Sequence, residues 1–191
     1  MKKIILSIVA VLAFGFANAQ SKGGDSSMSF GAKAGLNMAN IAGAEGASTL
    51  LAFHLGAFAE FKVSDKFAVQ PELLYSMQGA KYSVFGTSFT TNLNYLLVPV
   101  MAKYFVTDAI SINAGPQLGI LMSATTDGED VKDGYNTTDF GLNIGGGYNI
   151  GDNMMLDLRY NLGFSELQKD KPTGGDSNKN AVLQLSFGYK F

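Results

Sequence analysis

Five charged residues stand at offsets of five or seven positions from three aspartates in short polar stretches. The charged residues are Glu60, Glu72, Lys103, Asp157 and Arg159, and the aspartates are Asp65, Asp108 and Asp152. If the aspartates mark turns at one end of a sheet, the five side chains lie in one layer across it. Buried charges persist only when they are paired, so we expect a structural, ion-paired plug. A gated proton or ion path is the alternative use of these residues.

His54 is the only histidine. We expect its side chain to point inward near the long-loop end of the molecule, at a mouth where Asp139 is within reach. A His–Asp pair there would support protease-like chemistry, whereas the favoured alternative is a polar mouth residue bonded to its neighbours. A hydrolase acting on lipids would need the histidine on the opposite face. We therefore assign no catalytic residue and predict that the protein is not an enzyme.

Other candidate binding motifs have simpler explanations. The glycine-rich run 145–151 follows no βα unit, so it fails the context of a phosphate loop, and its small residues are expected to make room for Arg159 and Lys103. The acidic stretch 127–130, with Asp133, is better explained as a solvated loop than as a calcium site. The chain has no cysteine, which excludes disulfides and zinc-thiolate sites. We expect no metal and no cofactor.

The segments that carry these residues alternate apolar and polar side chains with the period of a β-strand. Glycine is abundant, at 23 residues, and no segment shows the apolar spacing of an amphipathic helix. Eight strands are predicted: Met28–Asn37, Leu51–Val63, Phe67–Tyr82, Leu93–Val106, Ile110–Met122, Thr138–Ile150, Met154–Phe164 and Ala181–Phe191.

The connections between these strands are of two kinds. Three are Asp-centred and short, 64–66, 107–109 and 151–153, and their aspartates are 43 and 44 residues apart. Four are longer and polar: Met38–Leu50, Ser83–Asn92, Ser123–Thr137 and Ser165–Asn180. An even number of strands with short turns at one end and long loops at the other predicts an all-β fold, an eight-stranded antiparallel up-and-down transmembrane β-barrel. Closure requires the last strand to pair with Met28–Asn37.

One face of the strands carries no charge and is uniformly bulky, as in Leu183, Leu185, Phe187, Tyr189 and Phe191 of the last strand. The other face holds the charges with many small residues. The interior of an eight-stranded barrel is only wide enough for side chains to fill it, so the bulky face belongs against lipid. The strand Leu93–Val106 is apolar on both faces, and we set its register by turning Lys103 inward. Pro71, Pro99 and Pro116 cannot donate to a ladder and predict local irregularities.

The N-terminus predicts export. Lys2 and Lys3 precede an apolar stretch that ends in Ala17-Asn18-Ala19, which is typical of a secretory signal peptide cleaved after Ala19. The predicted organisation is a signal peptide at 1–19, a short periplasmic segment at 20–27 and an outer-membrane barrel at 28–191. The net charge of −2 gives no basic field for nucleic acid.

Several segments together resemble the PorT-type outer-membrane β-barrel proteins, often called the porin family. They are FGAKAGLN (30–37), FAVQPELLYSMQG (67–79), YLLVPVMAKY (95–104), LDLRYNLGFS (156–165), the Asp-centred turns and the Phe-terminated last strand. The resemblance implies the outer membrane of a Gram-negative bacterium. It also implies that Phe187, Tyr189 and Phe191 form the signal that the barrel-assembly machinery recognises during insertion. The family often has an acidic residue where this chain has Leu97.

The expected function is that of a small, non-enzymatic outer-membrane protein with a charge-plugged interior. Its partners would be outer-membrane lipid and a surface or envelope protein that contacts the long loops Met38–Leu50, Ser123–Thr137 and Ser165–Asn180. A narrow or gated transport channel is the second hypothesis, and a hydrolase at the mouth using His54 is the third.

Overall fold

The computed structural model describes residues 28–84, 87–169 and 177–191. The predicted signal peptide and the segment 20–27 lie outside these residues. The strands are β1 (Met28–Ala42), β2 (Ala47–Ser48), β3 (Leu50–Ser64), β4 (Phe67–Val84), β5 (Thr87–Phe105), β6 (Ile110–Thr126), β7 (Glu129–Asp130), β8 (Thr138–Ile150), β9 (Met154–Gly163) and β10 (Lys179–Lys190). A 3-10 turn, η1 (Lys132–Gly134), follows β7. No helix in the described residues is long and apolar enough to cross a membrane.

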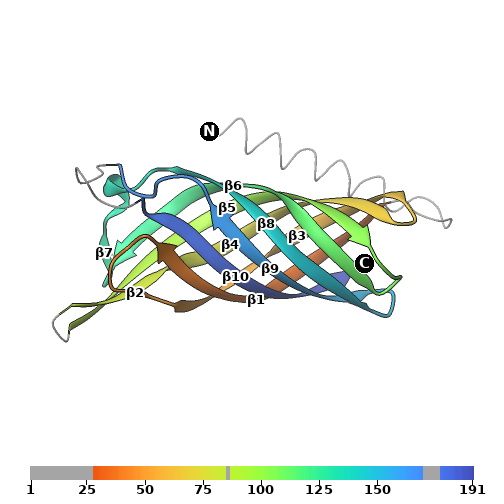
Figure 1. The fold of residues 1–191 in the computed structure, drawn as a ribbon, viewed down its shortest axis with the longest axis horizontal. Coiled ribbons are helices and arrows are strands. Elements are labelled where there is room, and N and C mark those ends of the chain that lie inside the picture. Colours follow the sequence, from red (N-terminus) through yellow and green to blue (C-terminus); the bar gives the residue numbers. More distant parts are fainter. Residues whose placement is uncertain (1–27, 85–86, 170–176) are drawn as a thin grey trace.

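The long strands close into a barrel (Figure 1). Within the described residues, β1, β3, β4, β5, β6, β8, β9 and β10 pair in antiparallel succession, and β10 returns to β1. The closing seam runs from Gly31 opposite Lys190 to Ala42 opposite Lys179. The eight-stranded barrel and the predicted pairing of the last strand with the first are confirmed. Figure 1 shows β2 and β7 at the end opposite the C-terminus, where β2 pairs with β4 and β7 pairs with β6.

The barrel wall is taller on one side than the sequence predicted. The stretch Ser83–Asn92, expected to be a polar loop, mostly continues β4 and β5, with Lys81 opposite Thr90 and Tyr82 opposite Phe89. Threonines and aromatic residues favour extended backbone, and the described residues of this stretch have cross-strand partners. This hairpin therefore projects beyond the rest of the wall at the long-loop end.

The two faces of the wall separate as predicted. Leu36, Leu55, Ile112, Leu158 and Leu185 are among the large apolar side chains exposed on the outside. The register set for β5 is also confirmed, because Lys103 is buried whereas Val100 and Tyr104 are exposed. Phe30 and Ala59, which pair with each other, are exceptions on the outward face, since only 5% and 1% of their surfaces are exposed.

The three strand prolines lie where the pairing of β3, β4, β5 and β6 is interrupted. Between β4 and β5 the ladder breaks after Pro71–Val100 and resumes at Leu74–Leu97. Between β5 and β6 it breaks after Pro99–Gln117 and resumes at Ala102–Ala114, past Pro116. The register is the same on both sides of each gap. The prolines, which have no backbone N–H to donate, therefore interrupt the ladder locally without shifting one strand relative to the next.

Candidate functional site

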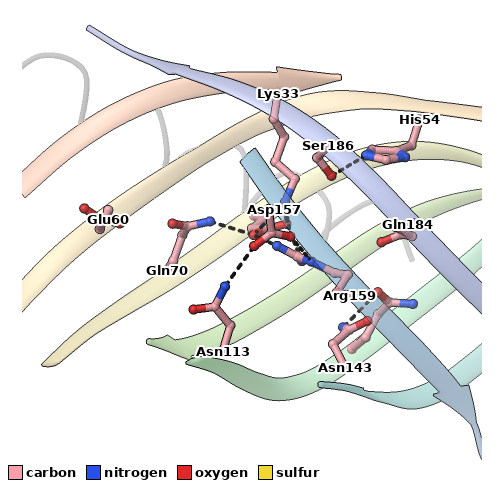
Figure 2. A network of polar contacts seen from close by, with 12 residues as sticks. Lys33, His54, Glu60, Gln70, Asn113, Asn143, Asp157, Arg159, Gln184 and Ser186 are labelled. Atoms are coloured by element: carbon pink, nitrogen blue, oxygen red, sulfur yellow. Dashed lines mark hydrogen bonds and ion pairs between the residues drawn. The ribbon is translucent and has the colours of Figure 1, made fainter. Parts of the chain in front are cut away.

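Glu72 on β4 is the centre of the buried charge network. Its two carboxylate oxygens accept hydrogen bonds from Nη1 and Nη2 of Arg159, both at 3.0 Å. Lys33 Nζ on β1 lies 3.0 Å from Oε2, and Gln70 Nε2 donates to Oε1 at 2.7 Å. Side chains from three strands thus meet at one carboxylate that is fully enclosed. Figure 2 shows Lys33, Gln70 and Arg159 converging inside the barrel.

Asp157 completes this group from β9. Its Oδ1 accepts from Arg159 Nε at 2.6 Å, and its Oδ2 accepts from Asn113 Nδ2 at 2.8 Å. Lys33 Nζ is 3.9 Å from the same carboxylate. Arg159 therefore bonds two acids at once through the planar fork that its guanidinium provides.

Glu60 on β3 is the centre of a second group, nearer the short turns. Lys103 Nζ and Lys190 Nζ each lie 2.6 Å from one of its carboxylate oxygens. Lys103 Nζ also donates to Gln70 Oε1 at 3.1 Å. Because Gln70 also donates to Glu72, a single amide joins the two groups into one network.

The structure places all five predicted charges, Glu60, Glu72, Lys103, Asp157 and Arg159, in this network. The sequence did not indicate that Lys33 and Lys190 belong to this layer, because neither stands at the matched offset from a turn aspartate. Counting both, the network holds four cations, Lys33, Lys103, Arg159 and Lys190, against three carboxylates.

Gly145 on β8 makes room for Arg159, one of the two residues that the glycine-rich run was expected to accommodate. The atoms nearest to a Cβ at Gly145, Gly146 or Gly147 include none of Lys103, the other one. Gly145 and Arg159 are cross-strand partners. A Cβ at Gly145 would lie 2.2 Å from the Leu158 carbonyl oxygen and 2.7 Å from Arg159 Cα. A side chain at this position would therefore displace the strand that carries the arginine.

His54 is buried beside the charge network rather than paired with Asp139. Its Nε2 lies 2.8 Å from Ser186 Oγ, and its Nδ1 lies 2.8 Å from Asn37 Oδ1. Asn37 Nδ2 donates to the Met77 carbonyl at 2.7 Å, which fixes the amide orientation. Nδ1 therefore carries the proton, and Nε2 accepts from the serine hydroxyl. The order Ser–His–Asn is that of a nucleophile, its base and an orienting group, but all three residues are at most 1% exposed.

Asp139 lies on β8 toward the long-loop end, and its contacts differ from the expected ones. Its Oδ2 accepts from Asn180 Nδ2 at 2.7 Å. The expected contact with His54 is replaced because both histidine nitrogens are engaged by residues of β1 and β10. An amide layer at this end also links Asn161 to Asn143, at 3.1 Å, and Asn143 to Gln117, at 3.1 Å.

The long-loop end is closed by an apolar cluster that sequence reasoning missed. We call it the apolar cap: Ile41, Leu74, Ala80, Leu93, Tyr95, Leu97, Leu121, Ala124 and Leu167, with Tyr82, Val131 and Tyr135 packed against it. The signal for it was the strand that is apolar on both faces, because Leu93, Tyr95 and Leu97 point inward. Leu167 comes from a polar loop, where no periodicity marks it. Burial in this loop cluster raises the pKa of the Tyr135 phenol.

Two surface loops are bonded together over the apolar cap. Asn136 N donates to the Leu167 carbonyl at 2.8 Å, and Lys169 N donates to the Gly134 carbonyl at 3.0 Å. The Asn136 side chain adds bonds to the carbonyls of Glu166 and Gln168. The backbone of both loops is thus satisfied locally, and Leu167 is held inward.

The short-turn end is open by comparison. A hollow of about 380 Å³ is lined there by Lys62, Asp65, Phe105, Asp108, Asn149, Gly151, Asp152 and Lys190. It brings the three turn aspartates to one rim, as their spacing predicted. Lys190, bonded to Glu60, forms its inner boundary.

The family model of the outer membrane protein β-barrel domain matches residues 18–169, which is most of the chain. The chain belongs to this family. Its place is accordingly the bacterial outer membrane, where the exposed apolar side chains face lipid. No curated protein matched the chain.

Solved structures agree with this family in fold. Neisserial surface protein A is 16% identical, with 88% of this chain and 100% of that chain covered and a TM-score of 0.56. Ail, the attachment invasion locus protein of Yersinia pestis, solved in complex with the heparin analogue sucrose octasulfate, is 18% identical, with 86% and 99% covered and a TM-score of 0.52. At these identities the likeness concerns the fold of this outer-membrane barrel protein.

Proposed function

We propose that this outer-membrane protein is a closed, non-enzymatic barrel that acts through its surface loops. The observation that carries the proposal is the two-level closure of the interior. The network around Glu72 and Glu60 joins β1, β3, β4, β5, β9 and β10 across the lumen. Above it, the apolar cap fills the long-loop end. A solute would have to break several buried ion pairs and expel Leu167 to pass.

Because the interior is filled and the outer wall faces lipid, the loops are the part of the protein that can contact a partner. The bonded pair of loops around Tyr135 and Leu167 presents a fixed surface rather than two independent strings of residues. A fixed surface loses little conformational freedom on binding, which favours contact with another protein. The sequence motifs of PorT-type proteins support placing the chain in that group, with an envelope or surface protein as partner.

A narrow or gated channel is the second candidate, and the unbroken chain of polar contacts from Lys190 through Glu60, Lys103 and Gln70 to Glu72 favours it. Liposome swelling separates the two. Proteoliposomes containing the purified barrel should swell in small sugars no faster than empty liposomes. A swelling rate that exceeds that of empty liposomes and falls steadily with solute size would contradict the closed barrel and support a channel.

A hydrolase is the third candidate, and the hydrogen-bonded order Ser186, His54, Asn37 favours it. Its enclosure argues against it, because a substrate would need a path to Ser186 Oγ through the filled lumen. A fluorophosphonate probe tests it directly. We expect equal, background labelling of the wild-type barrel and of the Ser186→Ala and His54→Ala variants. Labelling that Ser186→Ala alone abolishes would establish an active serine.

A further inference from the structure

Asp139 differs from the other carboxylates inside the barrel. Glu60, Glu72 and Asp157 each contact at least one cationic side chain, whereas no Lys or Arg in residues 28–84, 87–169 and 177–191 forms an ion pair with Asp139. Only 5% of its surface is exposed. Its Oδ2 has one neutral amide donor, Asn180, and its Oδ1 has no hydrogen-bond partner. A buried charge with so little compensation is costly.

Two neighbouring side chains also have an unbonded oxygen. Asn180 Oδ1 and Tyr95 Oη are buried without a hydrogen-bond partner. The amide of Asn180 cannot be turned to relieve this, because its Nδ2 already donates to Asp139. Tyr95 and Asp139 flank the same glycine: a Cβ at Gly119 would lie 3.3 Å from Tyr95 Cδ1 and 3.5 Å from Asp139 Cβ. Three buried oxygens without a hydrogen-bond partner, one of which belongs to a hydroxyl group, are thus carried by side chains grouped in one part of the lumen.

This group is enclosed between two layers. Leu167 of the apolar cap lies on the long-loop side, and the Tyr95 ring is itself part of that cap. The amides of Asn161, Asn143 and Gln117 lie on the other, and Asn161 Oδ1 is a further buried oxygen without a partner. The cations of the charge network are already bound to Glu72 and Asp157, so they do not compensate Asp139.

We propose that Asp139, Asn180 and Tyr95 form a buried site for one monovalent metal cation of the sodium or potassium class. Carboxylate, amide and hydroxyl oxygens are the donors that hard cations prefer. A single carboxylate neutralises one positive charge, whereas a divalent ion would leave an excess charge beneath an apolar layer. The described residues also contain no group of three His, Cys, Asp or Glu side chains of the kind that binds divalent metals. The ion would hold β5, β8 and β10 together beneath the cap.

Urea unfolding in different salts tests the site. The wild-type barrel, refolded in detergent micelles at mildly alkaline pH, is unfolded in choline, lithium, sodium, potassium or calcium chloride at matched ionic strength, and circular dichroism gives the midpoint. We expect a higher midpoint in sodium or potassium than in choline, rising to a plateau with ion concentration because the ion binds the folded state. Equal midpoints in choline and in every alkali chloride would overturn the proposal, and so would stabilisation by calcium alone.

Three variants connect the effect to these residues. Asp139→Asn should give the same midpoint in all salts. Asp133→Asn, which removes an exposed carboxylate at the same end, should keep the full ion effect. Tyr95→Phe should raise the half-effect concentration about tenfold, and it supplies the readout if Asp139→Asn does not fold. An ion effect that is unchanged in both Asp139→Asn and Tyr95→Phe would contradict the site.

Discussion

Arg159 and Glu72, 87 positions apart in the sequence, meet in the lumen with two parallel hydrogen bonds of 3.0 Å. The pair joins β9 to β4, which are not neighbours in the barrel wall. A cross-lumen contact of this kind fixes the barrel cross-section and fills it at the same time. Lys33 and Asp157 complete the pair, so the whole group is sensitive to the loss of one member.

Removing the Glu72 charge should strongly destabilise the barrel. Glu72→Gln leaves Arg159 and Lys33 short of a counter-charge in an enclosed site, and breaking a buried pair from one side costs about 3–5 kcal/mol. Urea unfolding in micelles measures the change, with the exposed Glu45→Gln as the control. Unfolding free energies for Glu72→Gln and Glu45→Gln that agree would contradict a structural role for the network.

A methyl group at Gly145 should be poorly tolerated. Gly145→Ala places Cβ against backbone atoms of β9, and overpacking of this kind costs about 1–3 kcal/mol. Gly134→Ala is the matched control, because nothing lies within 4 Å of a Cβ there. The same unfolding assay applies to both variants. If Gly145→Ala is as stable as Gly134→Ala, the space for Arg159 is not set by this glycine.

Truncating Leu167 should loosen the apolar cap. Leu167→Ala removes a side chain with only 2% exposure, and buried Leu→Ala changes cost about 2–5 kcal/mol. The substitution should loosen the surrounding loops more than it lowers the free energy of unfolding of the whole barrel, because few strands hold these loops in place. Limited trypsin digestion after the exposed Lys169 should become faster, whereas Leu51→Ala on the lipid face should leave it unchanged. Equal digestion rates would mean that Leu167 does not hold the loops.

The C-terminal aromatic residues should matter for insertion more than for the folded state. Phe191 is 75% exposed and stacks edge-on against Tyr189 at 5.8 Å. Phe191→Ala should reduce the amount of barrel in outer membranes of cells yet refold normally in micelles. Phe164→Ala, an exposed aromatic elsewhere on the wall, is the control for lost lipid contact. Equal membrane levels of the two variants would remove Phe191 from the assembly signal.

Much of this architecture could be predicted because barrel geometry follows from a period of two. Alternation fixed which face of each strand is wet, and the spacing of Asp65, Asp108 and Asp152 placed the charges at comparable heights. The same reasoning set Lys103 inward on a strand with apolar residues on both faces.

Contacts that involve loops, or that depend on where each strand lies around the circumference of the barrel, could not be predicted in this way. The height of Asp139 did not reveal that Asn180 on β10 would be its partner instead of His54. Leu167 sits in a polar loop, and its burial depends on hydrogen bonds to the backbone around Asn136. The inward apolar residues Leu93, Tyr95 and Leu97 were the one sequence sign of the apolar cap.

Single-channel recording in planar bilayers tests the closed barrel most directly. The wild-type protein, inserted at low density and recorded at both voltage polarities, should show no steady openings above the bare-membrane baseline. A variant that combines Leu167→Ala with Glu72→Gln, which opens both levels of closure, should show discrete conductance steps if it still inserts. Large, long-lived openings of the wild-type barrel would contradict the account.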